Sequence, residues 1–150
     1  MRTDLEIDEQ DGIVKVTIVP GEKVGDYTLD MSKDDVLKSL GKPNNIFYQQ
    51  ETYTLHNLPR KYYMCFEGGI SFLIVDGSVK GIGVGEPFYK FTNGLGVGDS
   101  EQDIIQAFGD DFQLYESEWK DYLIYKDEGL TFEIHKENRT VIEINVSRSG

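Results

Sequence analysis

Apolar residues recur at every second position in several segments of this chain, including residues 70–75 and 130–135. Successive side chains of a β-strand point to opposite faces, so alternation predicts strands with one buried face. The predicted core faces carry Ile70, Phe72, Ile74, Ile82 and Val84 in one sheet and Leu130, Phe132, Ile134, Ile144 and Val146 in another. Similar runs complete two antiparallel meanders, over 46–50, 61–66, 70–75 and 79–84 and over 112–118, 122–126, 130–135 and 140–146.

Residues 32–41 and 100–109 have a helical pattern instead, with three apolar side chains at i, i+1 and i+4 spacing. One apolar stripe predicts a helix that packs on one side. Each segment begins with a serine suited to an N-cap, followed by acidic residues that oppose the helix dipole. A glycine ends each segment, where a left-handed residue is expected: Gly41 and Gly109.

The helix and its meander occur twice. Residues 32–41 return as 100–109, residues 69–72 as 129–132, and Val79–Val84 as Val141–Val146. A repeat of this length is one supersecondary unit that buries its apolar face with help from its neighbour. We therefore expect an α+β fold in which the two repeats form one curved sheet with helices on one face. The expected division is 21–86 for repeat one and 87–150 for repeat two, within one structural domain.

Residues 1–20 are interpreted as a hairpin from a further, partial repeat. Asp11–Lys15 matches Asp76–Lys80, where Asp76-Gly77 predicts a two-residue turn. Leu5–Ile7 and Ile13–Val19 supply the two hairpin strands. We expect this hairpin to add to the edge of the first sheet or to cover its second face, because an unprotected edge invites aggregation.

The repeats differ in two places. Repeat one carries extra residues around 51–59, and insertions of this kind form loops that are frequent sites of function. On the second face of the sheet, repeat one has Leu73 and Val75 where repeat two has Glu133 and His135. That face is therefore expected to be apolar in the first half and more polar in the second.

The net charge, the length of the apolar runs and the number of cysteines limit the functions and cellular locations to be expected. The chain has 150 residues and a net charge of −12, which repels a phosphate backbone, so no nucleic-acid binding is expected. The charge either steers a basic protein partner toward the chain or only keeps it soluble, and solubility is the more common reason for such acidity. No run of apolar residues has the length of a membrane span, and the first residues lack a signal sequence, so a cytoplasmic protein is expected. Cys65 is the single cysteine, which rules out an internal disulfide and a CxxC pair.

Motifs for catalysis or cofactors are weak. The glycines of 81–85 and 94–98 fit structural turns better than a phosphate site, because the dinucleotide fingerprint lacks its third glycine. His56 and His135 have no partners at metal-ligand spacing. No cofactor, metal or catalytic residue is therefore expected. The aromatic residues either fill the core or anchor a partner, and the candidate partner-binding residues are Trp119, Tyr125, Leu73, Val75, Tyr53 and His56.

The segments Leu29–Ser32 and Leu40–Pro43, with the helix between them and the meander after them, resemble the BamE/SmpA-like small lipoproteins. The tandem arrangement is similar to the fold of the beta-lactamase inhibitor proteins. The resemblance covers about 21–85 and is degenerate in 93–146, where Asp111 stands in place of the proline. It implies a non-enzymatic protein that binds other proteins.

We therefore expect a protein-binding module of inhibitor or immunity type, with a partner and an oligomeric state that the sequence leaves open. The alternative is a small-ligand-binding protein or enzyme with a pocket beside the 51–59 insertion, around His56, Tyr53 and Cys65. A pocket that holds a strongly shifted titratable group favours the alternative, whereas a broad exposed face favours the module.

Overall fold

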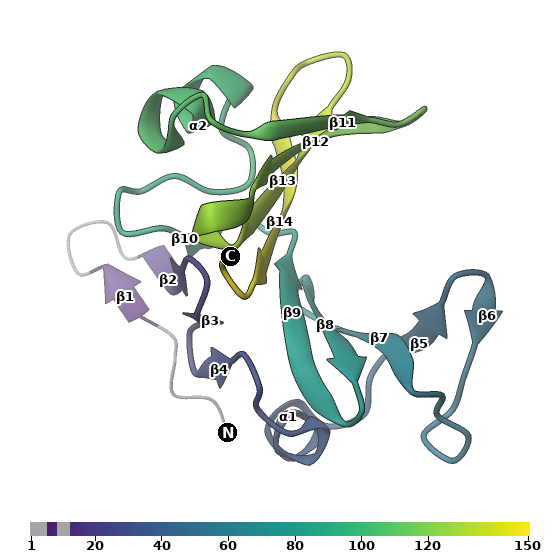
Figure 1. The fold of residues 1–150 in the computed structure, drawn as a ribbon. Coiled ribbons are helices and arrows are strands. Elements are labelled where there is room, and N and C mark those ends of the chain that lie inside the picture. The colour runs from purple at the N-terminus through teal and green to yellow at the C-terminus, as the bar shows by residue number, and fades with distance from the viewer. Residues whose placement is uncertain (1–5, 9–12) are drawn as a thin grey trace.

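The computed structural model describes residues 6–8 and 13–150, and shows two open β-sheets with two short helices (Figure 1). This confirms the α+β class. The larger sheet contains β5 (Asn45–Tyr48), β6 (Glu51–Thr52), β7 (Lys61–Phe66), β8 (Ile70–Val75), β9 (Ser78–Val84), β11 (Gln113–Glu116), β12 (Lys120–Tyr125), β13 (Leu130–His135) and β14 (Val141–Ser147). The smaller sheet contains β1 (Glu6–Asp8), β2 (Ile13–Val19), β3 (Lys23–Val24), β4 (Tyr27–Thr28) and β10 (Tyr89–Lys90). The helices are α1 (Lys33–Leu40) and α2 (Glu101–Phe108), and Lys126–Glu128 forms a 3-10 turn.

The nine strands of the larger sheet lie in the order β11-β12-β13-β14-β9-β8-β7-β5-β6, and every neighbouring pair is antiparallel. We call α1 with β5 to β9 the first half, and α2 with β11 to β14 the second half. The halves meet where β9 pairs with β14, with Gly83 opposite Asn145. The last strand of each half therefore lies at the centre of the sheet, as Figure 1 shows.

One hydrophobic core lies on the helix side of the larger sheet. Phe72 and Phe132 are fully buried in it, together with Val36 of α1 and Ile104 of α2. All ten residues predicted for the core faces are buried, so the alternation identified the buried face correctly: Ile70, Phe72, Ile74, Ile82, Val84, Leu130, Phe132, Ile134, Ile144 and Val146.

Both helices are capped at their N-terminal ends as the sequence predicts, but their C-terminal ends differ from the prediction. The hydroxyl oxygens of Ser32 and Ser100 accept hydrogen bonds from backbone N–H groups three residues later, each at 3.1 Å. At the other end, Gly41 and Gly109 have φ angles of 82° and 97° with ψ angles of −147° and 175°. The expected left-handed helical conformation is therefore wrong, although this positive φ still favours glycine.

Corresponding backbone contacts recur in the two halves. Lys33 N donates to Gly77 O and Glu101 N donates to Arg139 O, both at 2.9 Å, so each helix begins against the turn that precedes the last strand of its half. The last two strands of each half, β8 with β9 and β13 with β14, also share a register irregularity at corresponding positions, between 73 and 74 and between 133 and 134. In the first half, the turn is the expected pair, Asp76 and Gly77, both with positive φ.

The N-terminal strands do not lie where the sequence analysis put them. β2 pairs with β1, β3 and β10, and belongs to the smaller sheet rather than to an edge of the larger one. Val16 and Ile18 are buried in the core, and the Tyr27 ring packs edge-on against Phe72 at 5.4 Å. The smaller sheet therefore covers the helix side of the larger sheet, and the expected cover of the second face is wrong. The expected positions of Leu5 and Asp11 fall outside the described residues.

Each described helix has eight residues, and neither has the length and hydrophobicity to cross a membrane.

Candidate functional site

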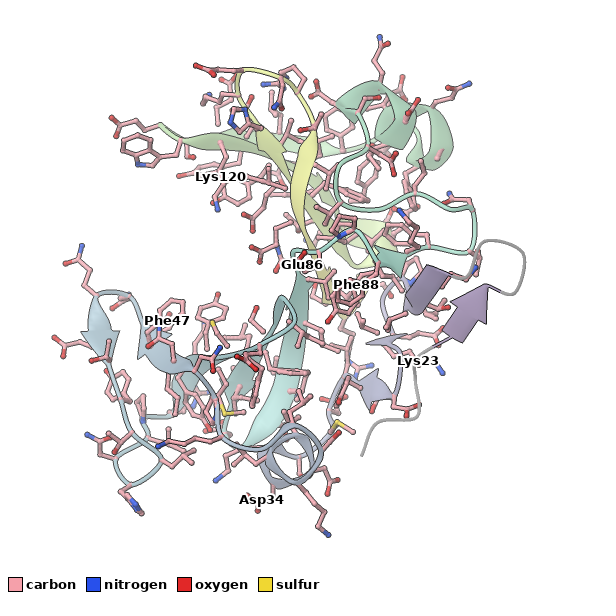
Figure 2. All side chains as sticks on the ribbon, turned by 180° about the vertical axis from the view of Figure 1, so that it is seen from behind. Lys23, Asp34, Phe47, Glu86, Phe88 and Lys120 are labelled. Atoms are coloured by element: carbon pink, nitrogen blue, oxygen red, sulfur yellow. The ribbon has the colours of Figure 1, made fainter. Side chains whose placement is uncertain are left out.

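The larger sheet has a second side, which we call the open face. The helices and the smaller sheet pack on the other side, whereas β7 and β8 alternate between buried and half-buried positions. Figure 2 shows Lys120 and Phe47 in the two halves, on the side of the molecule away from Lys23 of the smaller sheet. The strand register places on the open face Asn45, Phe47, Lys61, Tyr63, Cys65, Ser71, Leu73, Val75, Gly81, Gly83, Gln113, Tyr115, Lys120, Tyr122, Ile124, Thr131, Glu133, His135, Glu143 and Asn145.

The predicted contrast between the two halves is present on this face. Leu73 and Val75 are half-buried on β8, so the first half presents aliphatic carbon. Glu133 and His135 occupy the corresponding positions of β13, and Glu133 is only 7% exposed. The polar second half therefore holds a buried carboxylate, which requires partners.

Glu133 has those partners. Lys120 Nζ on β12 lies 2.5 Å from Glu133 Oε1, and Asn145 Nδ2 on β14 donates to Glu133 Oε2 at 2.8 Å. One charge and one amide therefore satisfy both oxygens of the buried carboxylate. Because the Asn145 amide nitrogen is directed at Glu133, its carbonyl oxygen is directed elsewhere.

That oxygen points over Gly83, at the centre of the sheet. A Cβ atom at Gly83 would lie 2.7 Å from Asn145 Oδ1, 2.9 Å from Glu143 Oε2 and 2.9 Å from Ser71 Oγ. Three oxygens from β8 and β14 therefore converge above a residue without a side chain. Gly81, the next open-face residue of β9, has only ordinary contacts around the same position, the nearest at 3.4 Å.

Glu143 is the unusual group of this cluster. It is half-buried, lies opposite Glu133 in the β13–β14 pairing, and makes no hydrogen bond or ion pair within the described part of the chain. Burial, and then the charge of Glu133, raise the pKa of Glu143 to about 7, while Lys120 opposes the increase. A substantial fraction of Glu143 is thus protonated at neutral pH.

Cys65 lies on the same face but is not an activated nucleophile. Burial raises the pKa of its thiol above the usual value, and the charge of Glu143 raises it further. A reactive cysteine requires the opposite shift, because the thiolate is the nucleophile.

Aromatic side chains flank the centre in both halves. Phe47 and Tyr63 stack with ring centroids 5.4 Å apart in the first half, and Tyr115 and Tyr122 lie 5.6 Å apart in the second. Tyr115 is 59% exposed at the edge strand β11. Aromatic rings of this kind supply contact area for a partner at low entropic cost.

The six residues predicted to bind a partner do not lie together in the structure. Leu73 and Val75 lie on the open face, and Trp119 is 79% exposed in the turn between β11 and β12. Tyr125 is 1% exposed, and its hydroxyl donates to Gly109 O at 2.7 Å. Its expected exposure is wrong, because Tyr125 lies two residues after Leu123 on β12 and so points to the same buried face.

Tyr53 and His56 lie apart from the open face. They line a pocket of about 410 Å³ beside the insertion, which forms β6 and the loop after it. The expected participation of Cys65 is wrong, because it does not line this pocket; the other lining residues are Lys42, Pro43, Asn44, Asn45, Ile46, Thr54 and Leu55.

Within residues 6–8 and 13–150, no three histidine, cysteine, aspartate or glutamate side chains are grouped so that they could hold a metal ion. His135 Nδ1 instead accepts a hydrogen bond from Glu137 N at 3.1 Å in a surface turn. No family model matches the chain, and neither the curated proteins nor the solved structures contain a match.

Sequence reasoning missed Lys120, Ser71, Glu143 and Asn145 as parts of one site. The signal was present for the last two, because the alternation that buries Ile144 also places its neighbours on the opposite face. The pairing of β9 with β14, which brings Gly83 beneath them, has no local signal.

Proposed function

We propose that this chain is a non-enzymatic protein-binding module of inhibitor or immunity type, and that its open face binds a basic surface of another protein. The observation that carries the proposal is Glu143, a half-buried carboxylate without a described partner at the centre of this face. Keeping a charge partly desolvated costs free energy, which a cation on a partner offsets.

The charge of the whole chain supports a basic partner. The sequence has 27 acidic and 15 basic residues, and a net charge of −12 steers positively charged surfaces toward the protein. This attraction is screened over about 8 Å at physiological ionic strength. The rate of association is therefore expected to fall as salt is added.

The exposed aromatic residues of the second half support a protein rather than a small ion as the ligand. Tyr115 and Trp119 are both more than half exposed, and lie on β11 and in the turn that follows it. Tyrosine and tryptophan are the most frequent energetic anchors of protein interfaces.

We also propose that the two halves are tandem BamE/SmpA-like repeats arranged as in the beta-lactamase inhibitor proteins. Two observations support this: the contacts from Lys33 to Gly77 and from Glu101 to Arg139 correspond, and β9 and β14 join the halves end strand to end strand. A repeat pair joined in this way leaves one broad sheet face for a partner.

The test is affinity capture followed by binding measurements on the captured protein. Tyr115→Ala combined with Trp119→Ala is expected to weaken binding by about 2 kcal/mol or more per anchor. Leu114→Ala is the matched control, because Leu114 lies on the same strand, is 49% exposed and points to the other side of the sheet. Equal loss in both variants, or a rate of association that is insensitive to salt, would contradict the proposal.

The pocket beside the insertion supports a second candidate function, the binding of a small molecule at Tyr53 and His56. Mass spectrometry of gently purified protein tests it. A stoichiometric metabolite that disappears in His56→Ala, but persists in Tyr115→Ala, would favour this candidate over the protein-binding module.

A further inference from the structure

The open face contains an arrangement more specific than a negative surface. Ser71 Oγ, Glu143 Oε2 and Asn145 Oδ1 all lie within 3 Å of the point where a side chain would begin at Gly83. They are a hydroxyl, a carboxylate and an amide oxygen, and each can accept a hydrogen bond. The described residues supply no donor to any of these three atoms.

We propose that these three oxygens form a seat for a primary ammonium group, the side-chain end of a lysine on the partner protein. This inference rests on the proposed function and adds the chemistry of the partner residue at the centre of the interface.

The donor set matches an ammonium group. A lysine ammonium has three N–H donors around one nitrogen, which suits three acceptors grouped this closely when the nitrogen lies on their outer side, away from the Gly83 backbone. Glu143 supplies the compensating charge. Arginine presents a planar fork that favours two parallel bonds to one carboxylate. Calcium needs six to eight oxygen ligands, usually with several carboxylates, and only Glu143 is charged here.

The neighbouring groups leave Glu143 available for this role. Lys120, the cation on β12, is hydrogen-bonded to Glu133 of β13, the strand between β12 and β14, and Asn145 is directed by the same carboxylate. From β7, burial raises the pKa values of both Tyr63 and Cys65, so neither becomes charged near pH 7. One carboxylate is therefore left without a counter-charge at the seat.

The chain offers a matched pair of variants. Gly83→Ala places a methyl group among the three oxygens, and these are side-chain rather than backbone atoms, so the oxygens must shift while the backbone can stay in place. Gly81→Ala adds the same methyl group to the same strand and face with only ordinary contacts. Neither glycine has a positive φ, so alanine is compatible with both backbones.

The experiment is an NMR titration of the full chain, labelled with ¹⁵N, with acetylated and amidated tetralysine at low salt. We expect shifts at the amides of Gly83 and Asn145, at least fivefold weaker binding in Gly83→Ala, and a change below twofold in Gly81→Ala. Glu143→Gln is expected to weaken binding to a similar extent. Binding to the wild type should tighten from pH 6 to pH 8 as Glu143 ionises, and remain flat in Glu143→Gln.

Three results would overturn the seat: equal binding by Gly83→Ala and Gly81→Ala, equal affinity for tetraarginine, or Ca²⁺ shifting the same amides at lower concentration than tetralysine. Glu143→Gln keeps the test decisive if Gly83→Ala does not fold. If capture of the partner depends on Tyr115 and Trp119 while Gly83→Ala leaves tetralysine binding unchanged, the seat fails and the proposed function stands. If Gly83→Ala weakens tetralysine binding but capture of the partner does not depend on Tyr115 and Trp119, the seat stands and the proposed function fails.

Discussion

Gly83 on β9 lies directly opposite Asn145 on β14, at the junction of the two halves of the larger sheet. The two residues also occupy corresponding positions in Val79–Val84 and Val141–Val146. One half has a side chain at this point and the other has none, so Asn145 extends over the glycine without a clash. The centre of the open face is therefore asymmetric, with polar atoms of β14 placed above bare backbone of β9.

The core face is expected to dominate stability. Phe72→Ala and Phe132→Ala should each reduce the free energy of unfolding by about 3–5 kcal/mol, because both rings are fully buried and their removal leaves a cavity. Trp119→Ala should cost less than about 1 kcal/mol, since its ring is mostly in solvent. Urea denaturation measures all three, and a loss for Trp119 equal to that for Phe132 would refute the assignment of faces.

Glu143 is expected to make stability depend on pH. Its pKa is raised to about 7 in the folded protein, so between the ordinary glutamate value and pH 7 the folded state binds more protons than the unfolded state. Stability should consequently fall as pH rises through this window. Glu143→Gln removes the charge and should be more stable than the wild type by about 1–2 kcal/mol at pH 8, allowing for partial exposure, with no gain at pH 4.

Chemical denaturation at both pH values measures this difference. Glu118→Gln is the control, because Glu118 is exposed in the turn between β11 and β12. A gain for Glu143→Gln that is the same at pH 4 and pH 8 would show that the carboxylate is not destabilised by its surroundings.

Gly129 is expected to tolerate no side chain. Its φ is 68°, and a Cβ atom would overlap Ser147 O and approach Gly21 Cα to 2.8 Å, and both are backbone atoms that cannot rotate out of the way. Gly77 also has a positive φ, but open space around it. Gly77→Ala should cost about 1–2 kcal/mol from backbone strain, and Gly129→Ala a further ~1–3 kcal/mol from overpacking. Thermal unfolding compares them, and equal losses would mean that the segments around Gly129 separate freely.

Local signals predicted much of the fold. Residues 61–66 and 70–75 are strands with the predicted bounds, and Ser32 and Ser100 cap the helices, because strand alternation and N-caps are short-range effects. Tyr125 was expected to be exposed, although it lies two residues after Leu123 in the same strand and therefore shares its buried face.

The candidate site was only partly predictable for a different reason. The sequence by itself determined which residues share a face of each strand, because the side-chain period is fixed by backbone geometry. Only the tertiary structure decided which face stays open and what meets at its centre. The smaller sheet could have covered either side, and packing of Val16 and Ile18 into the core placed it with the helices. Gly83 meets Glu143 and Asn145 through pairing of strands about 60 residues apart, which depends on packing of the whole sheet rather than on any local pattern.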